Sequence, residues 1–388
     1  MKKVEVLIIG GGVAGTTAAE MYRAGGGSGE VLIVSDESHR LYSRVLLPHA
    51  VKGAVDPEKV FLKTEAFYKE KGIELLAGRT VQRVDIRHRA AHLDDGSEIV
   101  FGKLVIAVGG KPRHWDVPGG DLPGVLRLQT FDDARRLAED LREGASFVIV
   151  GSGFIALEFA AIAAKKKCKA VLLNRGPHFW TSVLGKAIGE AVEKAVTDAG
   201  VTVRHGVKAT RVVGGTSVEA VETSSGERFD ASAVGLGIGI EAATGPFGDM
   251  RGDDGIRADE TLQTVHEGVW AAGDCAEFED RLLGGLRHAV GNWTNAVAQG
   301  RHVGKALLGE RKPFETLTQY TTNVVPGANL IFLGECRRLS GTESEERTIE
   351  PGRKLIEYRL KEGRLIGAIL LNVPDLRAET VERIRTGR

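Results

Sequence analysis

Cysteine is scarce in this chain, and the cysteines lie far apart. Only Cys168, Cys275 and Cys336 occur among the 388 residues, and they form no CxxC or CxxxxC pair. They cannot supply a four-cysteine iron–sulfur or zinc site, and no two are close enough in sequence to suggest a redox dithiol. We therefore interpret all three as small buried or half-buried side chains that carry no electrons.

Net charge and long apolar runs are lacking too. Lys and Arg number 52, as do Asp and Glu, so no overall field attracts nucleic acid or an anionic membrane. Glu5 and three glycines interrupt the N-terminal apolar run, and no later stretch approaches about 18 apolar residues. With 42% hydrophobic and 27% charged residues, the composition is typical of a folded protein of two or three domains. We expect a cytoplasmic protein without nucleic-acid or membrane partners.

A glycine-rich turn of the dinucleotide-binding type opens the chain. The apolar run 4–9 is typical of a strand buried on both faces, and an alanine-rich helical stretch follows the turn. Between them, Gly10, Gly12 and Gly15 have GxGxxG spacing. These glycines allow, in order, the tight turn, the approach of backbone to a pyrophosphate, and the packing of helix on strand.

The same pattern recurs in the middle of the chain. An apolar strand over 147–150 leads into Gly151, Gly153 and Ala156 with GxGxxA spacing, and a helical stretch follows. A dehydrogenase with one cofactor needs one such turn. Two turns predict that the chain binds two dinucleotides.

The strands that follow the two turns end in different residues. The first ends in Asp36 and Glu37, acids placed to hydrogen-bond ribose hydroxyls, and we favour Asp36. The second ends in Asn174 and Arg175. An acid there would favour the 2′-hydroxyl of NAD, whereas an arginine can pair with the 2′-phosphate of NADP. Arg175 thus favours NADPH as the bound nucleotide. The alternative is that Arg175 is a solvated turn residue, in which case it does not distinguish NADPH from NADH.

Taken together, these motifs resemble the two-dinucleotide-fold flavoproteins, the FAD-dependent pyridine nucleotide-disulfide oxidoreductase family. The stretch 104–119, which includes Gly109, is similar to the segment that leads from the FAD domain of that family into its NAD(P) domain. The stretch 268–278 resembles the second FAD motif. The resemblance implies that Gly273 and Asp274 in this motif contact the flavin ribitol and phosphate region.

The helical stretch 291–309, which includes Trp293, resembles the helix that directs its N-terminus at the flavin pyrimidine. A helix N-terminus stabilises the negative charge of reduced flavin without a titrating group. The stretch 233–245, with Gly237, lacks the Pro-Asn pair that the family often carries there. This departure concerns local detail and not the FAD domain as a whole.

The resemblance implies an α/β fold with two Rossmann-like dinucleotide-binding domains, the second inserted in the first, and a small α+β C-terminal domain. The FAD-binding domain would comprise 1–112 and 235–310, and the NAD(P)H-binding domain 113–234. The interface domain would comprise 311–388. In it, alternating apolar residues around "KEGR" predict a hairpin, and a short helix ends the chain.

The stretch "LYSRVLLPHAVKG" indicates the subgroup. Coenzyme A disulfide reductases and NADH peroxidases place a cysteine at the position of Val45, so thiol chemistry there is excluded. The stretch most resembles rubredoxin reductases and the flavoprotein part of assimilatory nitrite reductases. His49 stands where related ferredoxin reductases have a lysine near flavin N5, and such a group would pair with Glu158, which would raise the histidine pKa. Alternatively, His49 is a half-exposed helix residue, and Arg44 contacts ribose, adenine or protein.

We expect an FAD-dependent NAD(P)H oxidoreductase that passes hydride from NAD(P)H to flavin and electrons to a protein carrier such as rubredoxin or ferredoxin. One alternative is the flavoprotein component of a nitrite reductase, with a separate reductase subunit as partner, or a diaphorase-like NAD(P)H oxidase. Another is a redox sensor that binds FAD and NAD(P)H. The C-terminal hairpin could also form the face of a homodimer.

Overall fold

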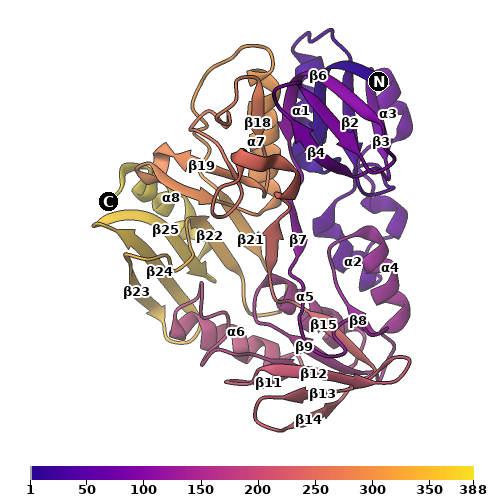
Figure 1. The fold of residues 1–388 in the computed structure, drawn as a ribbon. Helices are drawn as coiled ribbons and strands as arrows, with labels where there is room; N and C mark the ends of the chain where they lie inside the picture. Colours follow the sequence, from indigo (N-terminus) through magenta and orange to yellow (C-terminus); the bar gives the residue numbers. More distant parts are fainter. Residues whose placement is uncertain (1) are drawn as a thin grey trace. The chain divides into compact units, whose positions relative to one another are not determined.

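The computed structural model describes residues 2–388, and the chain divides into two compact units (Figure 1). Unit 1 comprises Met1–Ser43, Glu58–Lys111 and Glu241–Thr318. Unit 2 comprises Arg44–Pro57, Pro112–Ile240 and Gln319–Arg388. Two of the five points at which the chain passes from one unit to the other lie within short paired strands, β7 (Gly110–Pro112) and β16 (Ile240–Ala242).

Unit 1 is built on a seven-stranded sheet of order β3-β2-β1-β6-β5-β4, with β18 paired to β6. Strands β3, β2, β1, β6 and β18 are parallel, and β4 and β5 form an antiparallel extension. The strands of this sheet are β1 (Lys2–Ile9), β2 (Val31–Ser35), β3 (Ile73–Ala77), β4 (Val81–Asp85), β5 (Ala90–Leu93), β6 (Glu98–Ile106) and β18 (Val269–Ala271). Helices α1 (Val13–Ala24) and α7 (Trp293–Ala306) approach closely, since a Cβ on Gly300 would lie 2.4 Å from the Ala14 carbonyl oxygen.

A small three-stranded sheet completes unit 1. It contains β17 (Ile256–Arg257), β19 (Ala276–Asp280) and β20 (Leu286–Ala289). The short helix α3 (Glu65–Glu70) precedes β3, and its N-cap Thr64 accepts a hydrogen bond from the backbone N–H of Phe67. Such a cap satisfies one of the free N–H groups of the first helical turn.

Unit 2 contains a five-stranded parallel sheet of order β11-β10-β9-β15-β8. Its strands are β8 (Val125–Leu126), β9 (Ser146–Val150), β10 (Lys169–Leu173), β11 (Thr202–Arg204) and β15 (Ala233–Leu236). A second, antiparallel sheet consists of β12 (Ala209–Gly214), β13 (Val218–Thr223) and β14 (Arg228–Asp230). The helices of this part are α2 (Leu47–Val51), α4 (Phe131–Asp140), α5 (Phe154–Lys165) and α6 (Lys186–Asp198).

The last part of unit 2 is an antiparallel sheet of order β21-β22-β25-β24-β23 followed by helix α8 (Arg377–Thr386). We call it the C-terminal sheet. Its strands are β21 (Gln319–Thr322), β22 (Leu330–Gly334), β23 (Thr342–Glu350), β24 (Lys354–Lys361) and β25 (Arg364–Leu371). Glu362 and Gly363 connect β24 to β25 with φ of 52° and 74°, as a tight hairpin turn requires. The hairpin and the terminal helix predicted from the sequence are therefore confirmed.

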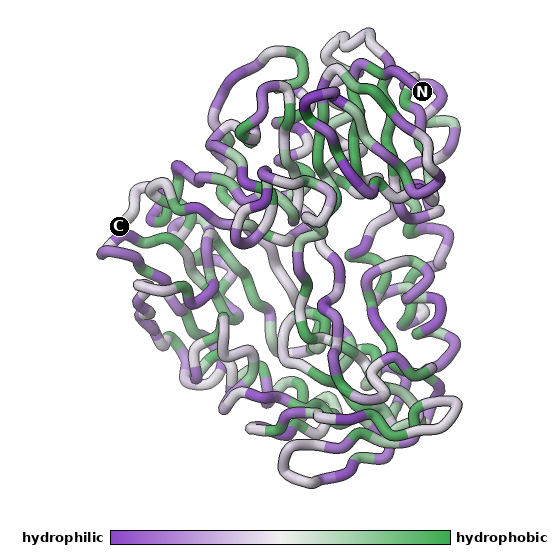
Figure 2. Tube along the Cα trace, in the orientation of Figure 1, coloured by the Kyte–Doolittle hydropathy of each residue, from purple (hydrophilic) through white to green (hydrophobic). Residues whose placement is uncertain are grey.

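The cores agree with the apolar runs seen in the sequence. Figure 2 shows hydrophobic segments along the central parallel strands, and the side chains of β2 and β9 are almost entirely buried. Parallel strands covered on both faces have this continuous apolar character. The predicted α/β class with two Rossmann-like sheets is confirmed.

The largest differences between the compact units and the predicted domain boundaries concern two segments. Residues 44–57 belong to unit 2, although the predicted FAD domain spans 1–112. Residues 319–388 also belong to unit 2, whereas the sequence suggests a separate domain over 311–388. Residues 319–388 group with unit 2 because side chains of the C-terminal sheet form hydrogen bonds with the loop before α6. The assignment of each domain to a cofactor stays a prediction.

Candidate functional site: two phosphate-binding turns

The first glycine-rich turn connects β1 to α1. Gly10 has a φ of 116°, and a Cβ there would lie 2.1 Å from the carbonyl oxygen of Ala107. A Cβ on Gly15 would lie 2.1 Å from the Gly10 carbonyl oxygen. At Gly12, the N-cap of α1, a Cβ would meet no atom within 4 Å. The turn therefore leaves open space beside the helix N-terminus, where free N–H groups and the helix dipole favour a phosphate.

The two acids predicted at the ribose lie at the carboxyl end of β2, in different surroundings. The Asp36 side chain is 50% exposed and forms an ion pair with Lys111, with 3.5 Å between Oδ2 and Nζ. Glu37 accepts a hydrogen bond from the Tyr42 hydroxyl. Ser35, before them, is buried beside Gly11. Asp36 is thus the carboxylate with more access to solvent, and its place at the ribose stays a prediction.

The second predicted FAD motif lies between β18 and β19. Gly273 has a φ of 82°, and its N–H donates to Gln299 Oε1 on α7 at 2.7 Å. Asp274 is half-buried, and a Cβ on Gly291 would lie 3.3 Å from its Oδ2. Gly109, which follows β6, has a φ of 63° with open space around it.

Helix α7 begins at Trp293, within the stretch 291–309 that resembles the helix at the flavin. The Asn292 side chain caps it by accepting the Asn295 N–H at 2.8 Å. Asn295 and Gln299 lie one turn apart and are 2% and 0% exposed, yet Asn295 Oδ1 and Gln299 Nε2 have no hydrogen-bond partner. Buried polar atoms without partners are rare in folded proteins and indicate a missing polar neighbour. Neither residue was predicted from the sequence, although two amides four residues apart in a helical stretch of small residues were a visible signal.

The second glycine-rich turn repeats the backbone of the first. Gly151 has a φ of 121°, and a Cβ there would lie 2.2 Å from the carbonyl oxygen of Gly237 at the end of β15. A Cβ on Gly237 would in turn lie 2.8 Å from the Ala156 backbone nitrogen. Gly153 is the N-cap of α5, as Gly12 is of α1. The structure thus brings these four predicted residues together at the second glycine-rich turn, and Gly237, predicted within the FAD domain, lies in unit 2.

The two residues predicted at the second ribose have different surroundings. Asn174 is 3% exposed. Its Nδ2 donates to the His178 carbonyl oxygen at 2.7 Å, and its Oδ1 accepts from the Gly176 N–H at 3.0 Å. Arg175 is exposed. The Asn174 side chain therefore holds the loop after β10 together, and Arg175 is the residue of the pair that extends into solvent.

The partner of Glu158 is Lys52 and not His49. Lys52 Nζ lies 3.8 Å from Glu158 Oε2, and the two side chains are 14% and 18% exposed. Burial and the charge of Lys52 lower the His49 pKa. The predicted pairing of His49 with Glu158, and the raised histidine pKa, are therefore wrong. Lys52 is the C-cap of α2 and follows His49 by three residues, which is close to one helical turn. Its side chain can therefore lie on the same side of the helix as that of His49, and it is longer than the histidine side chain.

Glu158 itself is strongly perturbed. Burial raises its pKa to about 7, although the nearby charge of Lys52 acts in the opposite direction. Its Oε2 accepts no hydrogen bond. A buried acid with a pKa near neutrality and a single cation beside it is a pattern found at functional sites.

Arg44 and Val45 of the stretch 41–53, like the three cysteines, have ordinary surroundings for their residue types. The Arg44 guanidinium donates to the Gln129 carbonyl oxygen, and Val45 is 55% exposed. Burial raises the pKa of Cys275 to about 11 and that of Cys336 to about 12, and it also raises the pKa of Cys168. Thiols with raised pKa values are poor nucleophiles at neutral pH. The interpretation of the cysteines as buried or half-buried and inert agrees with this result.

The chain matches a protein-family model over most of its length. The family model described as pyridine nucleotide-disulphide oxidoreductase matches residues 4–300. The chain belongs to this family. As a pyridine nucleotide-disulphide oxidoreductase it is an FAD-dependent oxidoreductase that uses a pyridine nucleotide, and the resemblance noted in the sequence is confirmed.

Individual members of the family are similar over most of their length. The chain is 31% identical over 371 residues to the ferredoxin reductase component of chlorobenzene dioxygenase from Cupriavidus sp. (strain PS12), which covers 95% of this chain and 89% of that protein. It is 33% identical over 336 residues to the ferredoxin–NAD(+) reductase component of the p-cumate 2,3-dioxygenase system of Pseudomonas putida, covering 85% and 81%. Among solved structures, the covalent putidaredoxin reductase–putidaredoxin complex matches with a TM-score of 0.91 and 25% identity, over 100% of this chain and 94% of that chain.

Proposed function

We propose that this protein takes a hydride from NAD(P)H onto bound FAD and passes electrons on to a small iron–sulfur carrier of the ferredoxin or rubredoxin type. The observation that carries the proposal is the pair of phosphate-binding turns in a chain whose three thiols all have raised pKa values. Without a thiol relay, the carrier must take electrons from the flavin directly. The similarity to two ferredoxin reductase components supports this choice of carrier.

Unit 1 has the features that FAD requires. The open space at Gly12 and the N-terminus of α1 fit the pyrophosphate, and Asp36 fits a ribose. Gly273, Asp274 and the two unsatisfied amide atoms of α7, Asn295 Oδ1 and Gln299 Nε2, fit the rest of the cofactor. When bound, FAD accepts two electrons as hydride and releases them singly, whereas the residues of the chain bind and orient it.

For the pyridine nucleotide, the turn at Gly151 and Gly153 would receive the pyrophosphate, and Arg175 would lie nearest the 2′ position of the ribose. Arg175 supports NADPH through pairing with the 2′-phosphate. No acid follows β10 to select the free 2′-hydroxyl of NADH. We therefore expect activity with both nucleotides and a preference for NADPH.

Lys52 takes the role that the sequence suggested for His49. It carries the charge that the resemblance expects in this stretch, and Glu158 holds its ammonium group. His49 keeps a lowered pKa and is neutral near pH 7. We assign the positive charge of this helix to Lys52 and leave His49 as its neighbour.

The helices of the described residues bear on where the protein works. None of the helices over residues 2–388 is both long and apolar enough to span a membrane. We place the protein in the cytoplasm because the NAD(P)H that it would oxidise is produced there. Detection of the native protein in a fraction other than the cytosol would overturn this part.

The experiment that tests the proposed function is anaerobic reduction of the purified, FAD-loaded protein with NADH and NADPH in parallel. Loss of the flavin absorbance band with either nucleotide, followed by its return on addition of oxidised ferredoxin or rubredoxin, is the expected result. A protein that binds no flavin, or whose flavin neither nucleotide reduces, would contradict the proposal. Return of the band with oxygen but with neither carrier would indicate an NAD(P)H oxidase.

A further inference from the structure

The two phosphate-binding turns differ at one position. Gly12 and Gly153 occupy the same place, as N-caps of α1 and α5 directly after a strand and its turn. A Cβ on Gly12 would meet no atom within 4 Å, whereas a Cβ on Gly153 would lie 3.7 Å from Cε2 and Nε1 of Trp180. The side of the second turn that a pyrophosphate approaches is therefore covered by an indole ring.

Trp180 holds this place with a strained backbone and aromatic neighbours. Its φ is 47°, a left-handed conformation that is unfavourable for a bulky side chain. The indole meets Phe154, the first residue of α5, edge-on with 4.5 Å between ring centroids. It also lies 5.7 Å from the Phe332 ring in β22. Strain of this kind persists only when surrounding contacts hold it.

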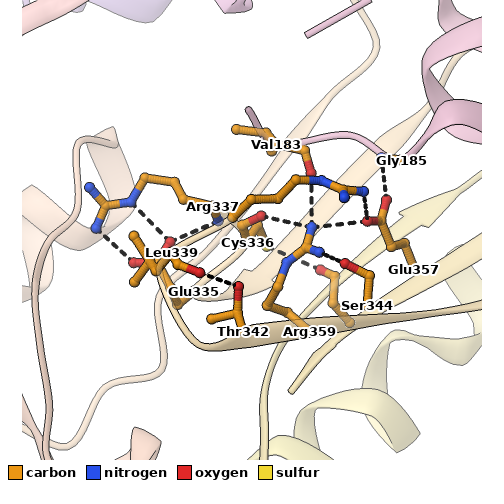
Figure 3. Close-up of polar contacts among 12 residues, drawn as sticks. Val183, Gly185, Glu335, Cys336, Arg337, Leu339, Thr342, Ser344, Glu357 and Arg359 are labelled. Carbon is orange, nitrogen blue, oxygen red and sulfur yellow. Dashed lines mark hydrogen bonds and ion pairs between the residues drawn. The ribbon is translucent and has the colours of Figure 1, made fainter. Parts of the chain in front are cut away.

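The residues just after Trp180 are bound to the C-terminal sheet. The backbone N–H of Arg338 donates to the Ser182 carbonyl oxygen at 3.0 Å. The Arg359 guanidinium donates to the Val183 carbonyl oxygen at 2.9 Å. The N–H of Gly185, the N-cap of α6, donates to the Glu357 carboxylate at 2.5 Å. Figure 3 shows Val183 and Gly185 meeting Arg359 and Glu357 at this point.

A buried charge cluster makes these contacts. Arg359 and Glu357 are each 1% exposed, and Arg359 Nη2 lies 3.0 Å from Glu357 Oε1. Arg338 Nη2 donates to the same oxygen at 2.8 Å. A buried ion pair contributes little net stability, because desolvation offsets the attraction between the charges, but it fixes geometry. Here the geometry that it fixes is that of the loop bearing Trp180, since the carbonyl oxygen of Trp180 accepts the N–H groups of Val183 and Leu184 at 2.9 Å each.

We propose that Trp180 is a lid on the pyridine-nucleotide turn, held closed by the C-terminal sheet through Glu357 and Arg359, and that NAD(P)H must displace it to bind. The proposal rests on the proposed function, because it takes the turn at Gly153 as the NAD(P)H site. The lid lowers the apparent affinity for the nucleotide by the fraction of molecules in which it is open. It acts on binding and leaves hydride transfer from bound nucleotide unchanged.

The test compares Trp180→Ala with Trp180→Phe in the FAD-loaded full chain. Stopped-flow flavin reduction over a range of NADH and NADPH concentrations gives the dissociation constant and the limiting rate separately. Trp180→Ala should lower the dissociation constant about three- to tenfold at an unchanged limiting rate, as expected if the lid is closed in most molecules. Trp180→Phe keeps a ring over Gly153 and should stay within about twofold of wild type.

Arg338→Ala tests the role of the C-terminal sheet, and Arg337→Ala is its matched control. Arg338 is a partly exposed arginine that bonds Glu357, whereas the neighbouring Arg337 bonds Glu335. Arg338→Ala should shift the dissociation constant in the direction of Trp180→Ala, and Arg337→Ala should not. Tryptophan fluorescence should change on addition of NAD⁺ to wild type, and this change should be lost in Trp180→Phe.

The outcomes separate the lid from the proposed function. If wild type shows no flavin reduction with either nucleotide, the proposed function fails. If wild type is active and Trp180→Ala binds nucleotide as weakly as wild type or more weakly, the lid alone is refuted. Persistence of the full fluorescence change in Trp180→Phe would refute it too, since another tryptophan would then be responding.

Discussion

At the scale of single residues, Lys52 and Glu158 form a largely buried ion pair, with 3.8 Å between Lys52 Nζ and Glu158 Oε2. Glu158 was recognised, but its partner was placed one helical turn too early, at His49. The error arose because the resemblance aligned the family lysine with His49, whereas the lysine of this chain stands three residues further along the same stretch. The contact that corrects the prediction, between Lys52 Nζ and Glu158 Oε2, joins residues more than 100 positions apart in the sequence. No local sequence pattern predicts such a contact.

The pair predicts a contrast between two substitutions. Lys52→Met keeps most of the length of the side chain and removes the charge, and it should slow flavin reduction about tenfold, which corresponds to about 1.4 kcal/mol in the barrier. His49→Ala should change the rate by less than about twofold, since His49 is neutral near pH 7. Stopped-flow reduction at saturating NADPH measures both. Equal losses in the two variants would show that the charge of Lys52 has no special role.

Glu158 predicts a pH dependence of stability. Its folded-state pKa of about 7 lies above the ordinary value of 4.5, so burial disfavours the ionised form. The stability that this group contributes is present below pH 4.5 and is lost as the pH rises through about 7. Between pH 5.5 and pH 8.5, the thermal midpoint of wild type should therefore fall by a few degrees more than that of Glu158→Gln. Parallel falls in the two proteins would contradict the raised pKa.

At the scale of elements, both strand–turn–helix units could be predicted from the sequence because the local backbone geometry of each turn requires glycine. Gly10 and Gly151 have φ values above 100° and press against the end of a neighbouring strand. The hairpin between β24 and β25 was equally local. The lid was not predictable, because Trp180 reaches Gly153 only through a loop held by strands more than 150 residues further along the chain.

The first turn predicts a contrast between its glycines. Gly12→Ala should fold normally, because φ there is −70° and no atom lies within 4 Å of the new Cβ, but it should weaken FAD binding by crowding the pyrophosphate. Gly10→Ala should destabilise unit 1 itself, since its Cβ would lie 2.1 Å from a backbone oxygen. The thermal midpoint of apoprotein and the dissociation constant for FAD separate the two effects. Tight FAD binding by Gly12→Ala would place the pyrophosphate elsewhere.

At the scale of the whole molecule, the sequence predicted the fold class, the family and the two cofactors, since two dinucleotide motifs in one chain are specific when taken together. It did not predict that the C-terminal sheet belongs to the same compact unit as the second dinucleotide turn. That association depends on Arg359 and Glu357. In the sequence these are two charged residues in a strand that alternates apolar and polar residues, a pattern that predicts exposure to solvent. Their burial follows from partners in a distant loop.

The central claim is that electrons pass from NAD(P)H through FAD to a protein carrier without a cysteine. The most direct measurement is the anaerobic rate at which NADPH reduces a purified ferredoxin, catalysed by FAD-loaded protein first treated with iodoacetamide under native conditions. We predict rapid reduction of the ferredoxin at a rate within about twofold of that of untreated protein, because the thiols have raised pKa values and carry no electrons. Loss of ferredoxin reduction after alkylation, with flavin reduction by NADPH intact, would contradict the account.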